Sequence, residues 1–153
     1  MNSKISRGLI FSSLVFLTNI IFLILNKNLL DFIFINSILF AGIIDFYKMI
    51  IPDTSSLIIL LIAIINFDIN NLFYALFILF ITLVFYNSNR LGFGDVKLLT
   101  VTAMYVGFEI FYFFIICMFL VVLINFNKKE TKIPFGFYIM LSIIGYYLIE
   151  VIL

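Results

Sequence analysis

The sequence lacks histidine, and its 153 residues include a single cysteine, Cys117. One cysteine cannot form a disulfide within the chain, and a chain without histidine has no zinc finger and no Cys–His nucleophile pair. Cys117 lies in an apolar run, where we expect it to pack against other side chains or face lipid. Any chemistry must therefore come from carboxylates, amines, hydroxyls or the backbone.

Charge is also scarce, because only 11% of the residues are charged and the formal net charge is +1. A nucleic-acid partner would normally require a dense basic surface, so we expect none. By contrast, 65% of the residues are hydrophobic, and the mean hydropathy is +1.31. A water-soluble domain of this length cannot bury so much apolar surface. The composition therefore predicts an integral membrane protein.

The apolar residues fall into runs separated by short polar breaks. Several runs are shorter than the roughly 20 residues that a spanning helix needs, so polar end residues must join them or some helices enter the membrane only partly. We predict an all-α, polytopic membrane helix bundle with about seven transmembrane helices, six or eight being the alternatives. The runs are Gly8–Leu25, Leu29–Ile44, Ser55–Phe67, Leu72–Tyr86, Val96–Val106, Ile110–Phe126 and Ile133–Leu153.

The first run has no small-x-small cleavage site after it, so we interpret it as an uncleaved span. Residues 1–28 would then add an N-terminal span to a core at 29–153, all within one domain. Basic residues favour the cytoplasmic side of a membrane. A cytoplasmic N-terminus leaves only Lys27 of the nine basic residues outside. We therefore predict a multi-pass protein of the inner (cytoplasmic) membrane, with these basic residues inside: Lys4, Arg7, Lys48, Arg90, Lys97, Lys128, Lys129 and Lys132.

This orientation also divides the acidic residues between the two membrane faces. The outer group sits at span ends or in short loops, where solvated helix caps explain it: Asp31, Asp68, Glu109 and Glu150. The cytoplasmic group is Asp45, Asp53, Asp95 and Glu130. Of these, Asp45 and Asp95 each lie at the junction of an apolar run and a cytoplasmic loop.

Asp45 ends the apolar segment 41–44, where ionising a carboxylate is costly unless water or a partner is near. A structural explanation would be an ion pair with Lys48, one helical turn further on. Pro52 cannot continue the preceding helix, and Asp53 begins a run suited to capping the next one.

Asp95 follows two glycines, Gly92 and Gly94, which flank a single residue. Glycine permits positive φ and close backbone approach, so this loop can turn sharply and let another chain lie against it. Asp95 could instead simply cap the helix that follows. Lys97 could either bias a nearby acid electrostatically or bind lipid phosphate, and we favour the contact with lipid.

The two acids together suggest chemistry, because both fall on the same predicted membrane face. Two carboxylates that share a site cannot both ionise comfortably, so one keeps its proton while the other activates water, as in aspartic proteases. Such a pair titrates as a unit, and its chemistry needs neither a metal nor a cofactor.

Three segments, in order, resemble the type IV prepilin peptidases and their archaeal preflagellin relatives. Residues 92–97 resemble the family's Gly-x-Gly-Asp motif, and residues 44–53 resemble the segment that carries its first catalytic aspartate. Residues 133–136 resemble the Pro-Phe-Gly segment that opens its last helix, and Phe137 replaces a proline often found next. The resemblance runs from about residue 42 to residue 145.

The resemblance implies an aspartic endopeptidase with Asp45 and Asp95 as its catalytic pair. Its substrates would be prepilin-like or preflagellin-like proteins, cut at the cytoplasmic membrane face between a basic leader and an apolar helix, usually after a glycine. Gly92 and Gly94 would let the substrate backbone approach. Supporting residues near the site would be Lys48, Pro52, Asp53 and Lys97.

One departure limits what the resemblance implies. Full-length bacterial members carry a cytoplasmic domain with paired Cys-x-x-Cys motifs, which accompanies N-methylation of the new terminus. This chain has one cysteine and resembles the short, peptidase-only branch, so no methyl donor is expected.

Two other functions remain open at this point. A small transporter or ion-pathway subunit could use intramembrane acids to relay cations, although it predicts acids near the middle of helices. An inactive membrane scaffold would use its acids only as helix caps.

Overall fold

The computed structural model describes residues 11–13, 15–20, 28–88, 90–125 and 133–152. Within these ranges the chain is helical and contains no strand, which confirms the predicted all-α fold class. Residues 11–13 and 15–20 are helical. The other elements are α2 (Leu29–Lys48), α3 (Asp53–Ile65), α4 (Ile69–Asn87), α5 (Phe93–Val106), the short 3₁₀ helix η1 (Gly107–Glu109), α6 (Ile110–Asn125) and α7 (Phe135–Ile152).

Several helices have the length and composition of membrane spans. Three helical stretches of the described chain are long and apolar enough to cross a bilayer, namely Leu29–Lys48, Ile69–Asn87 and Phe93–Ile124. Two shorter apolar helices are Asp53–Ile65 and Phe135–Glu150. The chain is therefore a multi-pass membrane protein, and the figure of about seven spans stays a prediction.

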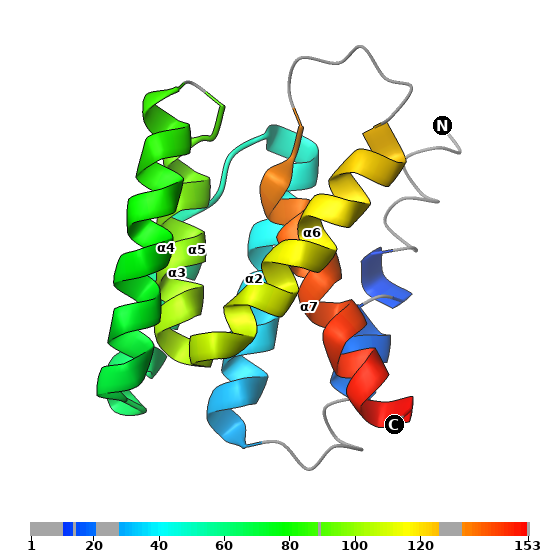
Figure 1. Cartoon of the computed structure of the whole chain (residues 1–153). Coiled ribbons are helices and arrows are strands. Elements are labelled where there is room, and N and C mark those ends of the chain that lie inside the picture. The colour runs from blue at the N-terminus through cyan, green and yellow to red at the C-terminus, as the bar shows by residue number, and fades with distance from the viewer. Residues whose placement is uncertain (1–10, 14, 21–27, 89, 126–132, 153) are drawn as a thin grey trace.

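The helices alternate in direction, so their connections collect at two ends of the bundle (Figure 1). The ends of α2 and α4 and the starts of α3, α5 and α7 all lie at the upper end in that view. Helix α5 packs against α3 and α4, while α7 packs against α2 and α6. This arrangement brings the loop after α2, the loop before α5 and the start of α7 together.

A close approach of α2 and α7 fixes the middle of the bundle. Gly42 lies against Met140, and a Cβ atom added to the glycine would come within 2.6 Å of the Met140 Cβ. No side chain fits between the two helices at that point, so glycine is required for the approach. Fully buried side chains of the same two helices include Phe34, Ile38 and Ile139.

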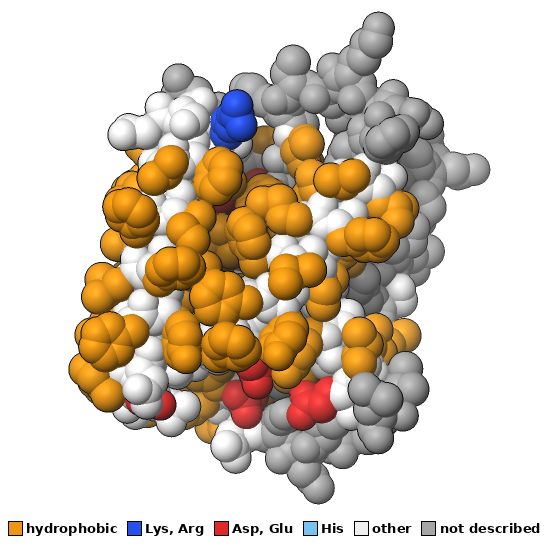
Figure 2. All heavy atoms as spheres, viewed as in Figure 1, with side chains coloured by type: hydrophobic (Ala, Val, Ile, Leu, Met, Phe, Trp, Pro, Cys, Tyr) orange, Lys and Arg blue, Asp and Glu red, His pale blue; other side chains and the backbone are white. Residues whose placement is uncertain are grey.

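The bundle carries apolar side chains on its outside as well as in its core. Figure 2 shows one face covered by hydrophobic side chains, with basic atoms at its upper edge and acidic atoms at its lower edge. Phe73 and Phe80 of α4, together with Ile115 and Phe119 of α6, are largely exposed. Such a continuous apolar surface suits lipid and would be a liability in water.

The lower end of the bundle is held by a buried tyrosine. The Tyr105 hydroxyl of α5 donates a hydrogen bond of 2.6 Å to the Asp31 carboxylate of α2, and the Tyr105 ring packs on Phe34. Asp31 is therefore more than the solvated cap that we predicted, because it also joins two helices. The prediction is confirmed for Asp68, which caps α4 by accepting a hydrogen bond from the Asn70 amide at 2.9 Å.

Candidate active site

Asp45 lies in the last turn of α2, where only 5% of its surface is exposed. The helix ends at Lys48 because Met49 adopts a left-handed conformation, with φ of 55°. The Met49 amide still donates a hydrogen bond of 2.8 Å to the Asp45 carbonyl, which closes the last turn. The chain then leaves the helix, and three residues separate Met49 from Asp53, where α3 begins.

The Asp45 carboxylate is held by the start of α7. Its Oδ2 atom accepts a hydrogen bond of 3.3 Å from the Phe137 amide, 92 positions further along the chain. The N-terminus of a helix favours a negative charge, so this is a suitable place for a carboxylate. Gly136 makes the approach possible, because a Cβ atom there would lie 3.1 Å from the same oxygen.

The structural explanation that paired Asp45 with Lys48 is wrong. Lys48 is exposed at the end of α2, and these two described residues form no ion pair. The prediction failed because it considered only neighbours along one helix, whereas the carboxylate turns toward a helix that is distant in sequence.

Asp95 is the third residue of α5, which begins after Gly92. Its Oδ2 atom accepts a hydrogen bond of 3.1 Å from the Gly92 amide, so the capping contact that we considered is present. Asp95 is also half-buried beside the end of α2. The cap therefore accounts for one oxygen of the carboxylate and leaves the other to face the site.

The two glycines before Asp95 serve close approach rather than an unusual backbone conformation. In the described part of the chain, Gly107 is the one glycine with positive φ, so Gly92 and Gly94 do not use the positive φ that glycine permits. A Cβ atom at Gly92 would lie 3.0 Å from Asp95 Oδ2, and one at Gly94 would lie 3.1 Å from the Ile51 Cβ.

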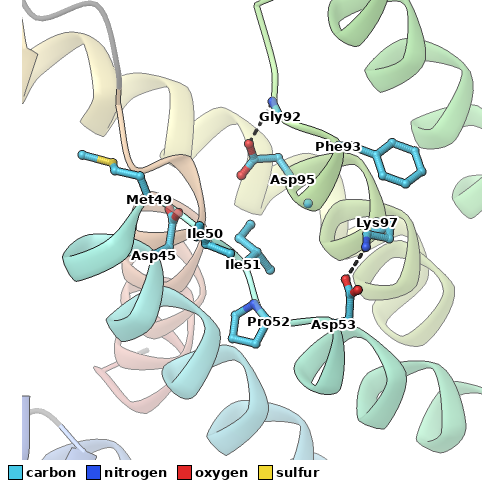
Figure 3. A pocket seen from close by; sticks show the side chains of 11 residues that line it. Asp45, Met49, Ile50, Ile51, Pro52, Asp53, Gly92, Phe93, Asp95 and Lys97 are labelled. Atoms are coloured by element: carbon cyan, nitrogen blue, oxygen red, sulfur yellow. Dashed lines mark hydrogen bonds and ion pairs between the residues drawn. The ribbon is translucent and has the colours of Figure 1, made fainter.

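Asp45 and Asp95 line the same cavity, although 50 positions separate them in the sequence. The cavity has a volume of about 490 Å³ and lies between the loop after α2 and the start of α5, as Figure 3 shows. The structure thus brings together seven of the eight site residues that we predicted, and Lys48 is the one that does not line the cavity. The lining consists of Asp45, Met49, Ile50, Ile51, Pro52, Asp53, Gly92, Phe93, Gly94, Asp95 and Lys97.

A second cavity, of about 620 Å³, adjoins the first and shares both acids with it. It continues between α4 and α6, where its walls include Thr82, Phe114 and Met118. Figure 2 shows a hollow at this level on the apolar face. These wall residues could not be found from the sequence, because an apolar side chain that lines a cavity looks the same in sequence as one that faces lipid.

Lys97 and Asp53 form an ion pair across the wall of the first cavity. The Lys97 amine also lies 5.2 Å from the centre of the Phe93 ring, so it has two contacts within the protein, and the lipid contact that we favoured stays a prediction. Asp53 is the first residue of α3 and Pro52 occupies the N-cap position, so the predicted capping role of Asp53 is wrong. The carboxylate instead connects α3 with α5.

The arrangement is that of a carboxylate site. Within the described residues, no three His, Cys, Asp or Glu side chains gather in a way that could hold a metal ion. Two acids from different helices meet a cavity large enough for water and a peptide segment. An ionised carboxylate there can accept a proton from water, and a protonated one can donate to a carbonyl oxygen.

Comparison with known proteins gives one family match. A model of the type IV leader peptidase family matches residues 32–126, which is more than half of the chain and includes both Asp45 and Asp95. No curated protein and no solved structure gives a match.

Proposed function

The chain belongs to the type IV leader peptidase family, and from this premise we propose that it is an aspartic endopeptidase with Asp45 and Asp95 as its catalytic pair. Its substrates would be prepilin-like or preflagellin-like proteins, cut between a basic leader and an apolar helix at the cytoplasmic membrane face. The observation that carries the proposal is that the two acids line one cavity although they come from different helices.

In the proposed reaction one carboxylate is ionised and the other is protonated. The ionised carboxylate takes a proton from a water molecule, and the resulting hydroxide adds to the scissile carbonyl carbon. The protonated carboxyl group donates its proton to the carbonyl oxygen. When the tetrahedral intermediate collapses, the carbon–nitrogen bond breaks and the leaving nitrogen takes the proton that came from water. One hydroxyl of the intermediate returns its proton to the carboxylate that had donated one, so the carbonyl forms again and the pair regains its starting protonation.

Both acids have partners that would keep them oriented during these steps. The Phe137 amide holds one oxygen of Asp45, and the Gly92 amide holds one oxygen of Asp95. Each contact comes from a helix start, so each is rigid and leaves the second carboxylate oxygen for the water or the peptide.

The two adjoining cavities support separate routes to the acids. The cavity between α4 and α6 is lined mainly by apolar side chains and suits an apolar helix that arrives from the bilayer. The cavity beside Asp53 and Lys97 has four charged residues in a lining that is otherwise apolar or glycine, and it suits water and the leader.

The two alternatives have less support. A cation relay needs acids along a path across the bilayer, whereas Asp45 lies in the last turn of α2 and Asp95 in the first turn of α5, at the same end. A scaffold needs no cavity between its acids. The family match also describes peptidases.

The test is a pair of isosteric changes, Asp45→Asn and Asp95→Asn, in membranes that also contain a prepilin-like substrate. We expect each change to lower the rate of leader removal, followed by mass spectrometry, at least about 100-fold, because each removes one proton-transfer group. The matched control is Asp68→Asn, which alters a helix cap at the opposite end of the bundle and should leave the rate unchanged. Cleavage at the unmodified rate by either site variant would refute the aspartic mechanism.

A further inference from the structure

Ile51 lies in the connection between α2 and α3, at the point where the starts of α5 and α7 meet. Although it belongs to a loop, its side chain is only 8% exposed. It lines the same cavity as Asp45 and Asp95, and Figure 3 shows it between these two residues. The reaction proposed above gives Ile51 no role.

The Ile51 side chain contacts a glycine at each end. At Gly94, in the first turn of α5, a Cβ atom would come within 3.1 Å of the Ile51 Cβ. At Gly136, in the first turn of α7, a Cβ atom would come within 2.9 Å of the Ile51 Cδ1. The base of the side chain therefore rests on α5, and its tip rests on α7.

Each of these glycines is next to a residue that fixes one of the acids. Gly94 directly precedes Asp95. Gly136 directly precedes Phe137, whose amide holds Asp45. Because a glycine has no side chain that could move aside, the size of Ile51 is transmitted directly to the two backbones.

The loop holds Ile51 at a fixed position. Met49 ends α2 in a left-handed conformation, and Pro52, with φ of −68°, leads directly into α3. The three residues between Met49 and Asp53 therefore have little freedom to relax if the side chain at position 51 changes.

We propose that Ile51 is a positioning residue, a spacer between the starts of α5 and α7 that sets the separation of the Asp45 and Asp95 carboxylates. The inference rests on the proposed function, because the separation matters only if the two acids act as a pair. A smaller side chain at position 51 lets the two helix starts approach each other. A larger one pushes them apart.

The separation can be measured through the pH dependence of cleavage. The alkaline limb of the rate profile reports the second ionisation of the pair, which becomes harder as the carboxylates approach each other. A change of about 1 Å in their separation alters this repulsion by roughly half a pKa unit.

A substitution of Ile51 by Val or Phe adds no charge and removes none, so the same charged groups surround the pair in each variant. Lys97 of α5 is paired with Asp53 of α3. Arg90 lines the second cavity. A shift of the alkaline limb caused by Ile51 therefore reports the separation of the acids.

The first experiment compares Ile51→Val and Ile51→Phe by the pH profile of leader removal. We expect the midpoint of the alkaline limb to move to higher pH by about half a unit in Ile51→Val, because the acids are closer together. In Ile51→Phe we expect it to move to lower pH by a similar amount. The control Ile59→Val removes the same methyl group from a fully buried site in α3 and should leave the profile unchanged. An alkaline limb that stays in place in both Ile51 variants, or moves in the same direction in both, overturns the inference.

The second experiment tests the two contacts separately. Gly136→Ala and Gly94→Ala should each lower the cleavage rate on the order of 10-fold to 100-fold, because each displaces an acid. Adding Ile51→Val removes the Cδ1 atom that faces Gly136 but keeps the Cβ atom that faces Gly94. We therefore expect it to restore part of the rate of Gly136→Ala and none of the rate of Gly94→Ala.

The two proposals fail in different ways. If Asp45→Asn or Asp95→Asn still cleaves, the proposed function is wrong. If both lose cleavage while the second experiment shows rescue of both glycine variants or of neither, only the spacer role of Ile51 is wrong.

Discussion

Lys97 in the first half of α5 pairs with Asp53 at the start of α3, across 44 positions of sequence. The pair lies on the wall of the cavity that Asp45 and Asp95 share. Because the Asp53 side chain is 80% exposed, water screens the attraction, and such pairs stabilise proteins only weakly. The pair therefore serves to position the start of α3 against α5 rather than to hold the bundle together.

We predict a small but real coupling between these two residues. Lys97→Met and Asp53→Asn should each lower the free energy of unfolding by less than about 1 kcal/mol, and the double variant should lose less than the sum of the two, with a coupling near 0.5 kcal/mol. Unfolding in detergent micelles measures all four states of the cycle. A coupling of zero would mean that the ion pair between Lys97 and Asp53 makes no net contribution to stability.

Gly107 is a second position where the backbone requires glycine. It ends α5 with φ of 64° and ψ of −127°, a conformation almost confined to glycine, and from it the chain turns into η1 and α6. A Cβ atom at this position would lie 2.1 Å from the Asn71 Oδ1. We predict that Gly107→Ala lowers the free energy of unfolding by about 2 kcal/mol or more, which thermal unfolding would detect.

The matched control is Gly145→Ala in α7. A Cβ atom there would meet no atom of the described residues within 4 Å. Alanine is a better helix former than glycine by roughly 0.5–1 kcal/mol, so this change should be neutral or stabilising. Equal losses of stability in the two variants would contradict the account of Gly107.

The sequence was sufficient to predict the helices and the two acids. Polar breaks between apolar runs separate the spans, so the predicted run Leu72–Tyr86 lies wholly within α4. Asp45 and Asp95 could be recognised because a carboxylate beside an apolar run needs an explanation. Both features depend on the composition of short segments, and that composition can be read from the sequence without a structure.

The sequence was insufficient to predict the partners of those acids. Phe137 holds Asp45 from 92 positions away, and nothing local marks its amide as a donor. Ile51 looked like one more apolar residue near the membrane, and its burial depends on two glycines from other helices. The alternative explanation of Asp45, an ion pair with Lys48, was wrong for the same reason, because it considered only a local neighbour. Contacts between segments depend on packing, which no single segment specifies.

The orientation of the bundle in the membrane stays a prediction, and cysteine labelling at the two ends of α4 can test it. Ser88 and Asn70 are exposed residues at opposite ends of α4, and Ser88 lies at the end that carries Asp45 and Asp95. Cys117 is fully buried, so its replacement by alanine gives a background without a reactive thiol. In that background we expect Asn70→Cys to react with a membrane-impermeant maleimide on intact cells, and Ser88→Cys to react only after the cells are opened. The reverse pattern would put the acids on the outer face, where a leader that remains in the cytoplasm could not reach them.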